Sequence, residues 1–305
     1  MIWQLQWESM VKTALLEDLG GMGDVTTEAI VPVSHCSRAT IVARQAGVMA
    51  GSAVVVEVFR QLDPELRVEV KVGDGQSFTT GQTLIALRGS SRAILVGERT
   101  ALNFLARACA IASQTRQVVE AIAATGARVV ATRKTTPGLR LLEKHAVEMG
   151  GGLPHRFGLD DAILIKDNHV AVAGGVAEAL KRARRRAGHM LKVEVEVDTL
   201  EQLAEVLPLG PDVVLLDNMP PATLRRAVEM VARRCPTEAS GGITLETARQ
   251  VAESGVDYLS LGSLTHSVNA CDLSMEFSTN TDGSAILADE HVGSLRLEQP
   301  VPTSL

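Results

Sequence analysis

Short runs of apolar and β-branched residues alternate with amphipathic helical segments through the second half of the chain. The apolar runs predict six strands, at residues 128–132, 162–166, 192–197, 212–217, 237–240 and 256–261. Helix starts lie between them: Thr199 with Gln202 or Asp198 with Glu201 forms a capping box, and Pro221 and Thr244 begin later helices. This order predicts parallel strands joined by right-handed crossovers. A barrel reduced from eight units and an open doubly wound sheet both fit the count.

The first hundred residues have a different pattern. Residues 39–42 and 68–72 are typical of strands and residues 52–61 of a helix, with glycine turns between them. An alanine-rich helix at residues 98–124 follows. We therefore predict an α+β domain with its linking helix at residues 1–125, whose first helix can pack on the barrel, and a catalytic α/β domain at residues 126–277. The polar stretch at residues 278–305 has no periodicity and predicts a disordered tail.

Composition excludes several classes of function. A net charge of −6 and an aromatic content of 3% argue against a nucleic-acid partner, and the basic run at residues 181–186 is typical of a solvated helix face. No apolar run reaches the roughly 20 residues of a membrane span, and residues 1–10 do not resemble a signal peptide. The cysteines at positions 36, 109, 235 and 271 have no metal-binding spacing, so we expect reduced, mostly buried thiols. These features predict a cytoplasmic protein.

Charged residues gather at the carboxyl ends of the predicted strands, where α/β barrels place their functional groups. The first group is cationic and lies within 34 positions: Arg133, Lys134, Arg140, His155, Arg156 and Lys166. Guanidinium groups match carboxylate or phosphate, and Lys166 ends an apolar strand, where a lysine is costly unless an anion meets it. This group predicts a site for a small, multiply anionic substrate.

A second group is acidic. The strand at residues 192–197 alternates valines with carboxylates, so we expect Glu194, Glu196 and Asp198 to point into the barrel, and Asp217 ends the next strand. Two carboxylates on neighbouring strand ends suit Mg²⁺ that carries a phosphorylated ligand and keeps several waters. Internal salt bridges with the nearby lysines and arginines are the alternative.

Two glycine loops complete the strand ends. Ser240, Gly241 and Gly242 lie between a strand and a helix, where backbone N–H groups can bind a phosphate. Gly262 and Ser263 follow the last strand, a usual phosphate position in barrel enzymes.

Together these motifs resemble the quinolinate phosphoribosyltransferase family. The resemblance covers about residues 10–277 and is carried by the blocks at residues 131–140, 143–145, 150–152, 155–156 and 164–169, with companions at 17–27, 98–103, 193–197, 215–218, 238–243 and 261–267. The sequence departs from the family in a longer turn at residues 20–23, in Cys109 with Ala110 where Ser-Gly is common, and in the segment after residue 277.

The resemblance implies a fold and a reaction. The fold is an incomplete, six-stranded parallel α/β barrel with a hammerhead-like α+β sandwich as its N-terminal domain. The reaction is the transfer of phosphoribosyl from phosphoribosyl pyrophosphate to quinolinate, with loss of CO₂, to give nicotinate mononucleotide and pyrophosphate for NAD synthesis. The resemblance also implies Mg²⁺ as the cofactor and a homodimer, or a larger assembly of dimers, with shared active sites.

The resemblance assigns roles to individual residues. Arg133, His155, Arg156 and Lys166 would hold the quinolinate carboxylates, and Arg99 is expected from the partner chain. Lys134 would meet the pyrophosphate or ribose. Glu196 and Asp217 would serve Mg²⁺, directly or through water, and the ribose hydroxyls. The loops at residues 240–242 and 262–263 would bind the 5′-phosphate. Lys134, Lys166, Glu196 and Asp217 are the residues expected to take part in catalysis.

Three other interpretations remain. A paralogue associated with molybdate transport would share the fold and act on another anionic substrate. A biotinyl or lipoyl carrier would explain the turns between residues 68 and 84, although its usual Met-Lys-Met or Asp-Lys-Ala tripeptide is missing. A barrel that binds ligands without catalysis is the third.

Overall fold

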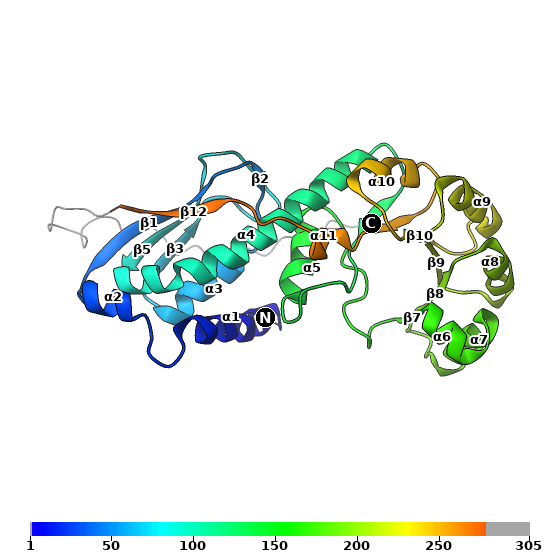
Figure 1. The fold of residues 1–305 in the computed structure, drawn as a ribbon, viewed down its shortest axis with the longest axis horizontal. Helices are drawn as coiled ribbons and strands as arrows, with labels where there is room; N and C mark the ends of the chain where they lie inside the picture. The colour runs from blue at the N-terminus through cyan, green and yellow to red at the C-terminus, as the bar shows by residue number, and fades with distance from the viewer. Residues whose placement is uncertain (1, 279–305) are drawn as a thin grey trace.

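The computed structural model describes residues 2–278 of the chain. It has two lobes joined by one long helix (Figure 1). The N-terminal lobe contains an antiparallel sheet in the order β12-β1-β5-β3. Its strands are β1 (Cys36–Ala43), β3 (Arg67–Val70), β5 (Thr83–Ser90) and β12 (Leu273–Ser278), and a small ribbon pairs β2 (Gly47–Val48) with β4 (Ser77–Phe78).

Three helices accompany this sheet: α1 (Ile2–Leu19), α2 (Val25–Ile30) and α3 (Ser52–Leu62). The carboxylate of Asp74 accepts hydrogen bonds from the backbone N–H groups of Gly51 and Ser52, each at 3.0 Å, and so satisfies the start of α3. The turns that resemble a carrier domain therefore serve to cap a helix in this lobe.

The linking helix α4 (Ser91–Ile122) starts at a capping residue, because the hydroxyl of Ser90 accepts a hydrogen bond from Ala93 N–H. It is longer than the prediction of residues 98–124. Gly97 is required where α4 meets α3, since a Cβ there would lie 2.6 Å from a ring carbon of Phe59. The helix then continues to the second lobe (Figure 1).

The second lobe is built on a parallel sheet of six strands in the order β6-β11-β10-β9-β8-β7. The strands are β6 (Arg128–Val130), β7 (Ile163–Ile165), β8 (Val193–Val197), β9 (Val213–Asp217), β10 (Thr237–Ser240) and β11 (Tyr258–Ser260). From β7 onward each strand pairs with its successor, and β6 pairs with β11. The chain thus winds in one direction, as in a barrel, and a doubly wound sheet is excluded.

The barrel is incomplete between β6 and β7. These two strands lie at opposite ends of the sheet order, and a single parallel bridge joins Val130 to Leu153 in the segment between them. The prediction of an incomplete, six-stranded barrel is confirmed. The segment that connects β6 to β7 contains α5 (Arg140–Met149) and most of the predicted cationic residues.

The remaining helices follow the strands: α6 (Asp167–Ala173), α7 (Val176–Arg186), α8 (Leu200–Val206), the 3₁₀ turn η1 (Leu207–Leu209), α9 (Pro221–Val231), α10 (Leu245–Ala252) and α11 (Ser263–His266). Thr199 caps α8 by accepting from Gln202 N–H, and Pro221 begins α9, as the sequence predicted. Within residues 2–278 no helix combines the length and apolar character that a membrane span needs.

The strands β2, β4, β5 and β12 were not predicted, and β12 pairs farthest from its place in the chain. β12 leaves the barrel lobe and returns to the first sheet, where it pairs with β1 in antiparallel register. Residues 273–277 were placed with the barrel because they follow its last predicted strand, and Ser278 was placed in the tail. The hydrogen bond from Arg44 to Ser274, |i−j| = 230, shows how distant in the chain their partners are. The predicted tail lies outside the described residues apart from Ser278.

Candidate functional site

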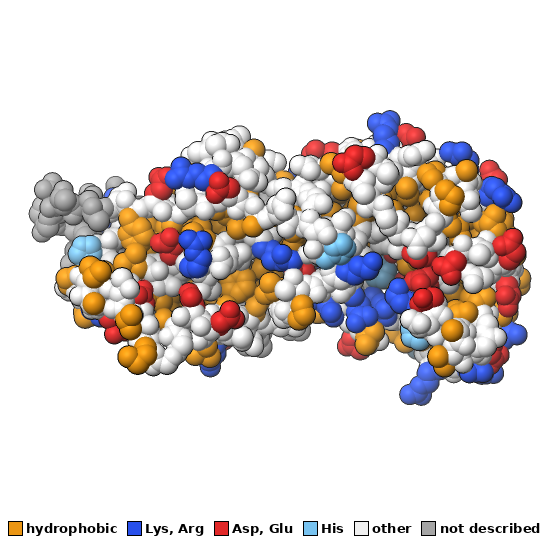
Figure 2. All heavy atoms as spheres, in the orientation of Figure 1, with side chains coloured by type: hydrophobic (Ala, Val, Ile, Leu, Met, Phe, Trp, Pro, Cys, Tyr) orange, Lys and Arg blue, Asp and Glu red, His pale blue; other side chains and the backbone are white. Residues whose placement is uncertain are grey.

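The predicted chemical groups come together where the parallel strands end. The register pairs β8 with β9 and β9 with β10, so that Ser240 lies opposite Asp217 and Glu196 opposite Leu215. β11 pairs with β6, which brings the loop after residue 130 beside the loop after residue 260. Figure 2 shows Lys and Arg side chains gathered next to Asp and Glu side chains over this part of the molecule.

Cations crowd one another in the segment between β6 and β7. Burial lowers the pKa of Arg156, and the charge of Arg133 lowers it further. Burial also lowers the pKa of Lys144 to about 8, with further lowering by the charges of Arg140 and Arg133. The Nε of Arg133 is buried and has no hydrogen-bond partner within the described chain. A buried donor surrounded by like charges is a site that an anion stabilises.

Buried contacts hold this cationic segment in place. Arg107 of α4 donates to the fully buried carboxylate of Glu143 at 2.7 Å, and Glu143 also accepts from the backbone N–H of Thr136 at 3.1 Å. Lys144 donates to the carbonyl oxygen of Pro154. The loop that carries Arg133 and the loop that carries Arg156 are therefore both attached to α5.

Lys134 lies against the last strand-end loop. Its backbone carbonyl accepts a hydrogen bond of 2.7 Å from the hydroxyl of Thr265. A Cβ at Gly262 would lie 2.7 Å from Cδ of Lys134 and 3.0 Å from Nε2 of His266, so only glycine leaves room for both side chains. The structure thus brings together the predicted Lys134 and Gly262, and adds His266, which the sequence analysis did not single out.

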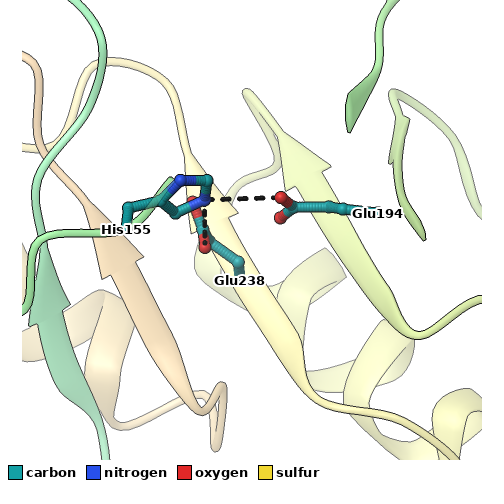
Figure 3. Close-up of side chains that lie close together, drawn as sticks. All are labelled: His155, Glu194 and Glu238. Atoms are coloured by element: carbon teal, nitrogen blue, oxygen red, sulfur yellow. Dashed lines mark ion pairs between the residues drawn. The ribbon is translucent and has the colours of Figure 1, made fainter. Parts of the chain in front are cut away.

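His155 points from its loop into the barrel (Figure 3). Its Nε2 lies 3.3 Å from Oε2 of Glu194 on β8 and 3.4 Å from Oε2 of Glu238 on β10. Burial opposes the charged ring, but the hydrogen bonds and charges of Glu194 and Glu238 outweigh burial and raise the pKa of His155 to about 9. In the neutral ring the other nitrogen, Nδ1, accepts from the backbone N–H of Arg156 at 2.7 Å. Both ring nitrogens are therefore engaged by the protein, and a direct hydrogen bond to substrate needs one of them to be released.

Two predicted roles meet in one ion pair. The Nζ of Lys166 lies 2.7 Å from Oε2 of Glu196. The side chain of Lys166 is 47% exposed and that of Glu196 only 9%, so the lysine can turn toward a ligand while the carboxylate stays fixed. The internal salt bridge weighed as an alternative is present.

Glu196 and Asp217 are the predicted Mg²⁺ residues. They stand on the neighbouring strands β8 and β9, and one oxygen of Asp217 accepts from the side-chain amide of Asn218. Each carboxylate keeps one oxygen outside these contacts, and oxygen ligands are those that Mg²⁺ prefers. The residues therefore fit a Mg²⁺ ion held mainly by substrate and water.

The first glycine loop has the backbone shape that the prediction requires. Gly241 and Gly242 have φ angles of 93° and 61°, a region that other residues rarely adopt. A Cβ on Gly241 would lie 2.1 Å from Oδ1 of Asn218, so the loop packs tightly beside the end of β9. Gly242 meets nothing within 4 Å and leaves the backbone open at the start of α10. The second glycine loop differs: Gly262 precedes the 4-residue helix α11 with a φ of −66°, and its surroundings are crowded.

Arg99 is apart from the other predicted residues. It is exposed on α4, next to Thr100, whose hydroxyl donates to Asp18 of α1 at 3.5 Å. This portion of α4 packs on α3 in the N-terminal lobe, through Gly97 and Phe59. No hydrogen bond or ion pair within residues 2–278 connects Arg99 to the strand ends of the barrel.

Three functional residues escaped the sequence analysis as members of the site: Lys144, Glu238 and His266. Glu238 was quoted in the block at residues 238–243, and alternation along β10 gives no reason to separate it from a surface residue. The signal that could have found it is its position two residues before the end of a buried strand, close to the place of Glu196, which lies one residue before the end of β8.

Comparison with known proteins agrees with these features. Residues 24–109 match the family model of the quinolinate phosphoribosyl transferase N-terminal domain, and residues 111–276 match that of the C-terminal domain. The chain is 44% identical over 278 residues to the probable nicotinate-nucleotide pyrophosphorylase (carboxylating) of Bacillus subtilis, covering 91% of this chain and 96% of that protein. It is 44% identical over 271 residues to the nicotinate-nucleotide pyrophosphorylase (carboxylating) of Mycobacterium leprae, covering 87% of this chain and 95% of that one.

Solved structures give the same result. The chain resembles NadC from Streptococcus pyogenes with a TM-score of 0.86 and 40% identity, covering 90% of this chain and 97% of that chain. The nicotinate-nucleotide pyrophosphorylase from Francisella tularensis follows with a TM-score of 0.85 and 33% identity, over 90% and 97% of the two chains.

Proposed function

Because the chain belongs to the quinolinate phosphoribosyltransferase family, we propose that its strand-end site binds quinolinate and phosphoribosyl pyrophosphate side by side. The enzyme transfers the phosphoribosyl group to quinolinate with loss of CO₂, which gives nicotinate mononucleotide and pyrophosphate. It is a pentosyltransferase of NAD synthesis.

The crowding of cations between β6 and β7 is the observation that carries the assignment of the quinolinate site. Arg133 and Arg156 repel each other in a partly buried place, and Arg133 Nε has no hydrogen-bond partner among residues 2–278. A pyridine dicarboxylate supplies two negative charges on one rigid ring, which relieves the repulsion and meets the free donor. When the Nζ of Lys166 turns away from Glu196, it adds a third cation to the quinolinate carboxylates.

Glu196 and Asp217 face the ribose in this arrangement. Departure of pyrophosphate leaves positive charge on the ribose ring, and fixed carboxylates stabilise that charge. A Mg²⁺ ion bound near them would neutralise the pyrophosphate as it leaves. Lys134, held beside Gly262, supplies a cation for the same leaving group.

The glycine loops are proposed to bind the 5′-phosphate. Gly241 and Gly242 turn the backbone so that N–H groups and the start of α10 lie at the end of β10. This fixes one end of the sugar while Glu196 and Asp217 face the other. The chemistry then follows from position: the ring nitrogen attacks the ribose carbon from which pyrophosphate departs.

Decarboxylation follows glycosylation in this proposal. The attacking nitrogen becomes quaternary, and its positive charge stabilises the electron pair left on the adjacent ring carbon when CO₂ departs. That carbon then takes up a proton from water, which gives the C–H bond of the product. The protein's part is to hold and neutralise the reactants, without a covalent bond to the enzyme.

The catalytic unit is proposed to be a homodimer. Arg99 is exposed on α4 and makes no contact with the strand ends within residues 2–278, which supports a role in the site of a second copy. Mixing two inactive variants, Arg99→Ala and Lys134→Ala, tests this: one of the two sites in a mixed dimer has both residues, and activity should return to roughly a quarter of wild type. Mixtures that stay inactive would contradict a shared site.

Product formation tests the function itself. Purified protein with Mg²⁺, phosphoribosyl pyrophosphate and quinolinate should release CO₂ and nicotinate mononucleotide in equal amounts, and chelation of Mg²⁺ should stop both. Absence of product would refute the assignment. The predicted cytoplasmic location stays a prediction.

A further inference from the structure

We infer that Glu194 and Glu238 are positioning residues for quinolinate, which act from inside the barrel through His155 to fix the place of Arg156. The inference rests on the proposed function, because Arg156 is taken as a quinolinate ligand. Neither carboxylate was assigned a role above.

The two carboxylates hold one hydrogen from two sides. Glu194 stands on β8 and Glu238 on β10, the strands that flank β9. Their oxygens lie 3.3 and 3.4 Å from the same atom, Nε2 of His155. These equal and rather long distances fit a single N–H shared between two acceptors. The direction of the imidazole ring is therefore set by two strands of the barrel.

The opposite side of the ring is held by the next residue. The backbone N–H of Arg156 donates to Nδ1 of His155 at 2.7 Å, and the guanidinium of Arg156 donates to the carbonyl of Ala162 at 3.1 Å. His155 itself has a φ of 52°, in the left-handed region that costs a non-glycine residue energy. A contact on each ring nitrogen keeps this strained turn, and so the backbone position of Arg156, in one conformation.

Stability is a poor explanation for these buried acids. Glu194 and Glu238 are 6% and 4% exposed, and Oε1 of Glu194 has no hydrogen-bond partner within the described chain. Burial raises the pKa of Glu194, with a smaller contribution from the charge of Glu238. Buried charges of this kind usually reduce stability relative to apolar residues, so their presence calls for a function.

A metal ion is the rival explanation. The three ligand atoms of His155, Glu194 and Glu238 lie within 4.8 Å of one another, and such a set could bind zinc. A metal would require Nε2 without its hydrogen. With Nδ1 accepting from Arg156, the ring is neutral and its one hydrogen sits on Nε2, toward the two carboxylates.

The test compares Glu194→Gln, Glu238→Gln, and the corresponding alanine variants with wild type in steady-state kinetics. Weakening the contact between a glutamate and Nε2 of His155 should raise KM for quinolinate by roughly 10-fold in the glutamine variants, which keep one acceptor oxygen. The alanine variants remove the contact and should raise this KM by roughly 100-fold. KM for phosphoribosyl pyrophosphate should change by less than about 3-fold.

Glu57→Gln is the matched control. Glu57 is also a buried carboxylate, 5% exposed, and pairs with Arg60 at 2.7 Å in the N-terminal lobe. It should leave both KM values unchanged. The glutamine substitutions preserve side-chain shape, so they keep the test decisive if the alanine variants fail to fold.

Three results would overturn the inference: equal increases in both KM values, no increase for quinolinate, or a stoichiometric metal in purified wild-type protein that is lost in Glu194→Gln. Wild-type activity on quinolinate separates this question from the proposed function. If the wild-type enzyme is active on quinolinate but the variants change both KM values equally, only the positioning role is refuted, and the proposed function stands.

Discussion

The two halves of the site are built in opposite ways. The cations are carried by the segment between β6 and β7, where the barrel is open and regular strand pairing is reduced to one bridge. The carboxylates Glu194, Glu196 and Asp217 stand on strands that pair on both sides. The carboxylates are therefore fixed by the sheet, whereas each cationic loop needs a separate attachment.

This difference explains the buried side-chain contacts that hold the cationic loops. Glu143 with Arg107 holds the loop of Arg133, and Lys144 holds the carbonyl before His155. These contacts replace the sheet hydrogen bonds that a seventh and eighth strand would supply.

The largest expected effect comes from removing one reacting group from each half. Lys134→Ala and Glu196→Ala should each lower kcat/KM by roughly 1,000-fold, or about 4 kcal/mol, because each contributes fixed charge to the transition state. Steady-state kinetics with both substrates measures this. Arg182→Ala, on the exposed pair with Glu178 of α7, should leave activity unchanged. Variants within a few-fold of wild type would show that these groups are misassigned.

Breaking an attachment of the cationic half should affect stability next. Glu143→Gln leaves Arg107 without its fully buried partner and should lower the free energy of unfolding by about 3 kcal/mol. Urea denaturation gives the value. Glu253→Gln removes an exposed ion pair with Arg249 and should change the free energy of unfolding by less than about 0.5 kcal/mol. Similar losses of unfolding free energy in both variants would show that the buried pair of Glu143 and Arg107 contributes no more than an exposed pair.

A subtler change tests the shape of the cationic half. Arg156→Lys keeps the charge but loses the planar pair of donors, so KM for quinolinate should rise by roughly 10-fold. KM for phosphoribosyl pyrophosphate, measured in the same experiment, should stay within about 2-fold. If KM for quinolinate is unchanged in Arg156→Lys, Arg156 acts as a point charge and does not bind a carboxylate through two donors.

The smallest effect is expected from a helix start on the strand-borne half. Thr199 caps α8 after β8, and Thr199→Ala should cost about 1 kcal/mol of stability in thermal unfolding. Activity per folded molecule should not change, because the sheet itself holds Glu196. A matching loss of activity would mean that the carboxylates depend on their loops as much as the cations do.

The sequence predicted the strand-borne half better than the loop-borne half. Alternating valines located Glu196, and an apolar run located Asp217, because strand periodicity depends on neighbours in the chain. The contact of His155 with Glu238 and the attachment of Lys144 to Pro154 depend on how a non-repeating segment folds back. The return of β12 to the first sheet escaped prediction for the same reason, since pairing with β1 is non-local.

The central claim is that the cationic half is shaped for two carboxylates, and substrate choice tests it most directly. Nicotinate mononucleotide can be measured with quinolinate or with nicotinate as the acceptor, since both lead to the same product. The two-carboxylate site predicts a kcat/KM for quinolinate at least about 1,000-fold higher, and a much smaller ratio in Arg133→Ala. Comparable values for the two acceptors in the wild-type enzyme would contradict the account.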